Sequence, residues 1–159
     1  MKKMFLGMLT AGLVMSCSLS ALAAISTREA IDIARREVPA TAENYGVKLD
    51  NGVYEVKFRD NSRYTKYEIE LNQDTGKVLE MEIKGSNSVK STLLQKTEAE
   101  IRDIVLAEYP DAQNLFIKVD RDNQYYEYEA EFNTAKYWKV ELDISPVTGV
   151  IGKRDLKYR

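Results

Sequence analysis

The residue types that usually perform catalysis are nearly absent from this chain. It has no histidine, which removes the commonest general base and the commonest transition-metal ligand. Its single cysteine is Cys17, and no serine precedes a lysine by three residues or occupies a Gly-x-Ser-x-Gly elbow. There is no glycine-rich phosphate loop. General acid-base chemistry is left to carboxylates and lysines, so we expect no enzymatic activity and no cofactor.

One acidic segment has the oxygen-rich composition of a cation-binding loop. The segment Asp120–Asn123 (DRDN) carries side-chain oxygens at alternate positions, as a hard cation such as calcium would require. It lacks the glycine and the distal glutamate of a complete loop. We therefore favour a solvated hairpin turn here and at Arg59–Arg63, and we assign no metal site.

Aromatic residues are concentrated between positions 125 and 138, and tyrosine and tryptophan dominate binding hot spots. The alternation places three of them on the apolar register, where we expect core positions: Tyr126, Tyr128 and Trp138. Four residues fall on the charged register and are our candidates for partner binding, with the tyrosines as anchors: Tyr125, Glu127, Tyr137 and Lys139. The alternative is a solvated sheet surface on which opposite charges pair across strands.

The elements that would position these residues occur twice along the chain. Ser26 with Glu29, and Thr97 with Glu100, have the spacing of a capping box at a helix start. Apolar residues at intervals of three and four follow each box, and a proline (position 39 or 110) ends each predicted helix. The sequence therefore predicts one amphipathic helix at the start of each copy.

After each helix the apolar period changes from about 3.6 to 2, which is typical of strands with one buried face. The predicted strands are 47–49, 54–58, 67–71 and 77–83 in the first copy and 115–119, 126–132, 138–144 and 150–155 in the second. A threonine-glycine turn precedes the last strand of each copy, at Asp74–Gly76 and Val147–Gly149, where glycine supplies a positive φ.

These patterns predict an α+β fold of two tandem units, each with an N-terminal helix packed on a three- or four-stranded antiparallel sheet. The small, polar stretch Gly85–Ser91 (GSNSVKS) is the expected linker. Unit 1 then spans residues 24–84, the linker 85–91 and unit 2 residues 92–159.

The first 23 residues have the features of an export signal. Lys2 and Lys3 precede an uncharged stretch that ends in Ala21-Leu22-Ala23, the small-x-small form of a cleavage site. A transmembrane helix is one alternative, and lipidation at Cys17 is another. Cleavage leaves a chain without cysteine, so we expect a periplasmic or secreted protein without disulfides and without a membrane span.

The chain has 23 basic and 25 acidic residues, and two of the basic residues lie in the signal. Binding to nucleic acid or to an anionic membrane requires a concentrated basic surface. We therefore exclude both as expected partners.

The capped helix ending in proline, the strands YEVKF and YEIEL and the turn DTGKV resemble the PepSY domain, found in propeptides of secreted metallopeptidases and in many bacterial envelope proteins. The likeness covers the mature chain twice, although Val147 stands in the second turn where the first has aspartate. Related two-copy proteins resemble the β-lactamase-inhibitor-like fold, in which an open sheet face grips an enzyme. The resemblance implies an inhibitory or regulatory binding module and supplies no catalytic residues.

Our leading hypothesis is a non-catalytic exported binding module that inhibits or regulates a secreted or envelope enzyme of the peptidase type. The alternative is an envelope protein that binds a small ligand or responds to a metal through a cleft between the two units. A structural or assembly role is a third hypothesis.

Overall fold

The computed structural model describes residues 24–86 and 88–159. Within these ranges the helices are α1 (Thr27–Ala34), the 3₁₀ turn η1 (Arg35–Glu37) and α2 (Glu98–Glu108). The strands are β1 (Glu43–Asp50), β2 (Val53–Asp60), β3 (Thr65–Asn72), β4 (Val78–Gly85), β5 (Gln113–Asp122), β6 (Tyr125–Asn133), β7 (Tyr137–Ile144) and β8 (Ile151–Tyr158). The predicted α+β class is thereby confirmed, and the short predicted strands at 47–49 and 115–119 are full strands.

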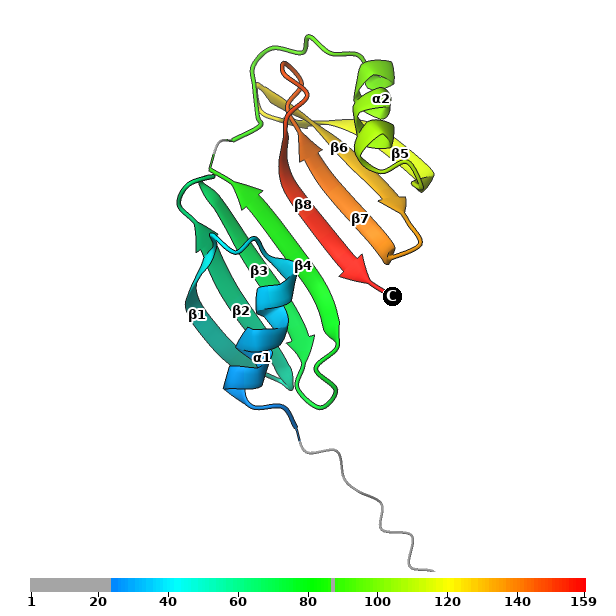
Figure 1. The fold of residues 1–159 in the computed structure, drawn as a ribbon. Helices are drawn as coiled ribbons and strands as arrows, with labels where there is room; N and C mark the ends of the chain where they lie inside the picture. Colours follow the sequence, from blue (N-terminus) through cyan, green and yellow to red (C-terminus); the bar gives the residue numbers. More distant parts are fainter. Residues whose placement is uncertain (1–23, 87) are drawn as a thin grey trace, which may run out of the picture.

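All eight strands of the described chain form one antiparallel sheet in the order β1-β2-β3-β4-β8-β7-β6-β5 (Figure 1). The expectation of a small sheet in each unit needs correction, because β4 and β8 pair directly. Their register runs from Glu80 opposite Lys157 to Lys84 opposite Lys153. An unpaired last strand would expose a row of backbone donors and acceptors, and this pairing satisfies them. We call the β4–β8 contact the seam.

Each helix begins at the predicted capping box. The backbone N–H of Ser26 donates to the Glu29 carboxylate at 2.8 Å, and the N–H of Glu29 donates to the Ser26 hydroxyl at 3.3 Å. Thr97 and Glu100 repeat both hydrogen bonds at the same lengths. The two boxes thus satisfy backbone donors that have no partner inside a helix.

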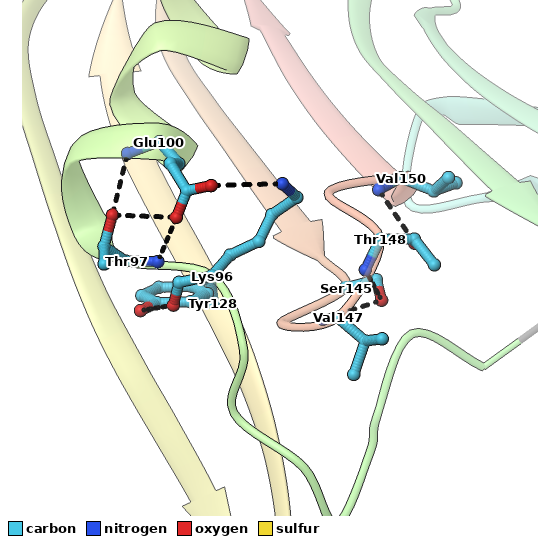
Figure 2. Close-up of polar contacts among 8 residues, drawn as sticks. All are labelled: Lys96, Thr97, Glu100, Tyr128, Ser145, Val147, Thr148 and Val150. Carbon is cyan, nitrogen blue, oxygen red and sulfur yellow. Dashed lines mark hydrogen bonds and ion pairs between the residues drawn. The ribbon is translucent and has the colours of Figure 1, made fainter.

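In the second copy the threonine-glycine turn holds Lys96, the residue that precedes the capping threonine; Figure 2 shows the hydrogen bonds inside the turn and those around Lys96. The hydroxyl of Ser145 accepts hydrogen bonds from the backbone of Val147 and Thr148. The N–H of Lys96 donates to the carbonyl of Pro146 within this turn at 2.8 Å. The carbonyl of Lys96 accepts from the Tyr128 hydroxyl at 2.8 Å. The start of the helix is therefore tied to both the turn and the sheet.

The first copy repeats this arrangement with other residue types. Asn72 takes the place of the serine and accepts from the backbone of Asp74 and Thr75. The N–H of Ile25 donates to the carbonyl of Gln73 at 2.8 Å, and the Tyr54 hydroxyl donates to the carbonyl of Ile25 at 3.1 Å. In both copies the turn therefore accepts a backbone hydrogen bond from the residue that precedes the helix cap, which gives the repeated turn a structural role.

Both helices lie on the same face of the sheet (Figure 1). Their buried residues, Ala30, Ala34, Ile101 and Val105, join apolar strand residues in one core cluster. Met81 on β4 and Leu156 on β8 are paired in register and buried, which continues the core across the seam. The alternate strand residues point to the opposite face.

The turn between β2 and β3 differs from the solvated turn that the sequence predicts. Asp60 is fully buried, and its carboxylate accepts hydrogen bonds from the Thr41 hydroxyl at 2.6 Å and from the hydroxyl and backbone of Ser62. These hydrogen bonds lower the pKa of Asp60 to about 2 because they stabilise its charged form. The buried carboxylate thus holds the turn in place by accepting hydrogen bonds from its backbone and from Thr41.

Candidate interaction surface

The sheet face that points away from the helices is charged. We call it the open face, and its central side chains are Glu55, Lys57, Glu68, Glu70, Glu80, Glu82, Lys153, Asp155, Lys157, Lys139, Glu141, Asp143, Glu127, Glu129, Glu131, Phe116, Lys118 and Asp120. Strand alternation places them there, since each is one residue away from a position that faces the helices. No helix of the described chain covers this face (Figure 1).

A cavity of about 480 Å³ on the open face lies over β5 to β8. Five carboxylates line it, from Glu127, Glu129, Glu131, Glu141 and Asp143, together with two lysines and Phe116. Burial, followed by the nearby charge of Glu127, raises the pKa of Asp143. This part of the face therefore carries an excess of negative charge.

Cross-strand ion pairs connect the lysines of this face to some of the carboxylates. Lys118 contacts Glu129 at 2.6 Å. Lys139 contacts Glu131 on β6 at 3.4 Å and, along its own strand, Glu141 at 2.9 Å. The two cross-strand pairs match the solvated, cross-strand paired surface that the sequence offers as an alternative. Paired lysines neutralise only part of the acidic surface, because carboxylates outnumber them around the cavity.

Two large aromatic side chains protrude beside this acidic region. Phe116 on β5 is 60% exposed and Trp138 on β7 is 52% exposed, and both line a second cavity of about 260 Å³. The ammonium group of Lys157 lies 5.9 Å from the centre of the Trp138 ring. An exposed aromatic pair at a concave, charged surface has the composition of a binding hot spot.

The predicted core position of Trp138 is wrong, and a bulge is the reason. The pairing of β7 with β8 shifts between Tyr137 and Lys139, so the alternation breaks at Trp138. Tyr137 turns toward the core instead and packs edge-on against Tyr158, with ring centres 5.0 Å apart. Of the other two expected core residues, Tyr128 is buried and Tyr126 is half-buried.

The four candidate partner-binding residues do not form one cluster. Tyr125 is 43% exposed at the start of β6, next to the β5–β6 turn. Tyr137 begins the antiparallel neighbour β7, so it lies at the other end of the strand pair. Glu127 is buried to 8% exposure and pairs with Lys90 at 3.3 Å, while Lys139 lines the smaller cavity. Their partner-binding role stays a prediction.

Sequence reasoning did not select Phe116 as a site residue. The strand pattern could have identified it as exposed. Phe116 lies between Leu115 and Ile117, which face the other way, and on the same side of the strand as Lys118. No comparable signal existed for Trp138, since a bulge depends on the partner strand.

Three carboxylates from β5 and β6 approach one another on the open face. One oxygen each from Asp120, Glu127 and Glu129 lies within 4.8 Å of the others. Lys90 and Lys118 already contact two of these groups, at 3.3 Å and 2.6 Å. Two of the three carboxylates are therefore already paired with lysines.

The alternative hypothesis concerns the space between the two copies. The seam makes the sheet continuous there, and Ser91 in the expected linker forms a two-bond bridge with Tyr126. A cavity of about 260 Å³ near the linker is lined by both copies, including Lys84, Lys90 and Lys153. The unit and linker boundaries stay a prediction.

The expected signal peptide at residues 1–23, with Cys17, lies outside the described residues. No helix among the described residues is long and apolar enough to cross a membrane.

Comparison with solved structures shows distant likenesses. The Bacillus megaterium YpeB C-terminal domain has 13% identity and a TM-score of 0.44, over 82% of this chain and 62% of that domain. A BLIP-like protein from Bacteroides fragilis has 14% identity and a TM-score of 0.35, over 84% and 88%. A DUF2874 family protein from Bacteroides uniformis has 15% identity and a TM-score of 0.32, over 82% and 90%. No curated protein matches the chain.

The family assignment comes from the sequence of the chain itself. The model of the PepSY family, described as the peptidase propeptide and YPEB domain, matches residues 24–82 and again residues 95–153. The two matches contain both capping boxes and both threonine-glycine turns. They confirm the tandem repeat and the resemblance seen in the sequence, and the chain belongs to the PepSY family.

Proposed function

We propose that this protein is an exported, non-catalytic module that binds a secreted or envelope enzyme of the peptidase type on its open face and regulates that enzyme. Membership of the PepSY family supports a propeptide-like or inhibitor-like module. The family description does not identify the target, so the open face itself must indicate what kind of surface binds there.

The observation that carries the proposal is the exposure of Phe116 and Trp138 at one cavity on a sheet face that no described helix covers. Large aromatic side chains bury much area when a partner docks, and they lose little conformational entropy because they have two rotatable bonds. Leaving two of them in water is unfavourable in the free protein. A docked partner would remove that penalty.

Charge indicates the chemistry of the partner surface. The cavity next to the aromatic pair is lined by five carboxylates and two lysines. A partner that presents lysine or arginine side chains would meet complementary charge there, which speeds association and fixes orientation. Glu127 lines the acidic cavity and Lys139 lines the cavity of the aromatic pair, so both would take part in this contact, whereas Tyr125 would lie at its margin. We therefore expect the partner to be a protein with a basic surface segment.

Affinity capture with matched variants tests the proposal. The purified protein is immobilised and exposed to secreted and envelope extract, and retained enzymes are identified and then purified. The test variant is Phe116→Ala with Trp138→Ala. The control is Tyr64→Ala. Tyr64 is 72% exposed in the β2–β3 turn, so this variant also removes an exposed aromatic ring, but one away from the proposed contact.

We expect the double variant to lose the retained enzyme and the control to keep it. The purified enzyme should also change its activity when the wild-type protein is added, and should not respond to the double variant. Equal retention by the double variant would refute docking at this surface. Retention without any change in enzyme activity would refute regulation.

A further inference from the structure

Two carboxylates meet at the seam in the middle of the open face. Glu80 lies on β4 opposite Lys157, and Asp155 lies on β8 opposite Glu82. Glu80 and Asp155 are therefore diagonal neighbours across the strands that join the two copies. One oxygen of Asp155, Oδ1, is buried and has no hydrogen-bond partner among the described residues. A buried oxygen without a donor is unfavourable.

The neighbours of Glu80 do not supply that donor. The charged groups that face the pair are Glu70 on β3, Glu82 on β4, Lys153 and Lys157 on β8, and Lys139 and Glu141 on β7. Lys157 is 3.7 Å from the Glu80 carboxylate and Lys139 is committed to Glu131 and Glu141. Glu82 contacts Lys84 and Lys153. Three carboxylates and three lysines therefore surround the pair, and Oδ1 is still left without a donor.

We propose that Glu80 and Asp155 share a single proton across the seam, which makes the contact between the two copies sensitive to pH. The protonated Glu80 carboxyl donates to Oδ1 of Asp155, so the orphaned oxygen gains its hydrogen bond. The same proton removes one of two adjacent negative charges. Loss of the proton leaves two carboxylates that repel each other across β4 and β8. This inference does not depend on the proposed function.

The electrostatics of the site agree with the geometry. Burial, followed by the hydrogen bond and the charge of Asp155, raises the pKa of Glu80 from 4.5 to about 7. Because the two groups interact, this value describes the titration of the pair. Folding therefore takes up a proton between pH 4.5 and about 7. The stabilisation is complete below about pH 4.5, declines as pH rises, and is absent above about pH 7.

The proton itself can be observed in the purified wild-type protein. The side-chain carboxyl carbon of Glu80 is followed by ¹³C NMR from pH 4 to 9. We expect a midpoint near 7, and we expect Asp155→Asn to move that midpoint downward because it removes the neighbouring charge. A midpoint near 4.5 in the wild-type protein would overturn the proposal.

Unfolding measurements test the link to stability. In Glu80→Gln the side-chain amide donates to Asp155 at every pH, whereas Glu82→Gln removes the same charge from the neighbouring open-face position. Between pH 4.5 and 7, the folding constant of the wild type should fall relative to Glu80→Gln by several-fold to about tenfold per pH unit. Glu82→Gln should retain the wild-type decline. An identical decline in Glu80→Gln would count against the shared proton.

Hydrogen exchange locates the effect. Protection factors, which correct for the intrinsic pH dependence of exchange, should fall above pH 7 for amides between β4 and β8 more than for those between β2 and β3. Glu80→Gln should abolish this difference. A uniform change in both strand pairs would show that the seam is not the sensitive contact.

Discussion

Gly149 in the second turn lies against Ile104 of α2. A Cβ atom placed on Gly149 would clash with the Cδ1 atom of Ile104 and would lie 3.1 Å from the Cε atom of Lys96. The first copy has the same relationship, because a Cβ on Gly76 would lie 2.9 Å from the Cδ1 atom of Ile33. Each glycine thus serves the turn by its positive φ and serves the helix by its lack of a side chain.

Gly149→Ala should lower the free energy of unfolding by about 2–4 kcal/mol, because it combines left-handed strain with overpacking. Gly52→Ala separates the two effects, since Gly52 has a φ of +79° and no atom within 4 Å of an added Cβ. That control should cost about 1 kcal/mol. Urea unfolding gives both values, and equal losses in the two variants would mean that contact with the helix is unimportant.

Tyr54 and Tyr128 should contribute equivalent hydrogen bonds in the two copies. Each hydroxyl donates to the carbonyl just before a helix, at 3.1 and 2.8 Å. Replacement of either by phenylalanine should cost about 1 kcal/mol, because the carbonyl loses its donor. The double variant should show the sum, since the sites share no partner. Denaturant unfolding of the single and double variants checks this. A variant with an unchanged free energy of unfolding would mean that water replaces the hydroxyl as the donor.

Replacement by alanine should destabilise the protein at Tyr137 but not at Trp138. Tyr137→Ala removes a ring packed on Tyr158 and should destabilise the protein by about 2–3 kcal/mol. Trp138→Ala removes an exposed ring and should change stability by less than about 0.5 kcal/mol. Thermal unfolding distinguishes them. A larger loss of stability for Trp138→Ala than for Tyr137→Ala would mean that Trp138 is the buried residue, and it would contradict the bulge.

Asp60 should make the protein sensitive to acid. Its pKa is lowered from 3.8 to about 2, so its contribution to stability is complete above about pH 4 and is lost as pH falls through about 2. Asp60→Asn should lower stability at neutral pH and flatten the acid part of the profile. The control Asp50→Asn changes an exposed carboxylate at the preceding turn. Acid unfolding followed by fluorescence measures both, and an unchanged acid profile in Asp60→Asn would contradict this role.

Calcium should not stabilise the wild-type protein. Lys90 and Lys118 already contact two members of the Asp120, Glu127 and Glu129 cluster. A ligand that binds only the folded state must raise the melting temperature. We expect no shift at millimolar calcium and a rise only after Lys90→Gln with Lys118→Gln frees the carboxylates. A rise in the wild-type protein would favour the metal-responsive alternative.

Local sequence patterns were sufficient to predict the helices and strands and to predict which side of most strands is buried. Capping boxes at Ser26 and Thr97 marked the helix starts, and alternation placed residues such as Tyr128 in the core. The glycines at 76 and 149 identified the repeated turns. These features are local, since they depend on backbone conformation and on which side of one strand a residue faces.

The sequence alone determined the helices, the strands, the repeat and the absence of histidine. Only the tertiary structure decided that β4 pairs with β8, that Trp138 turns outward beside Phe116, and that Glu80 meets Asp155. Backbone hydrogen bonds between strands are nearly independent of residue type, so the sequence does not specify which edges meet. A bulge likewise arises from a pair of strands and leaves no mark on either one alone.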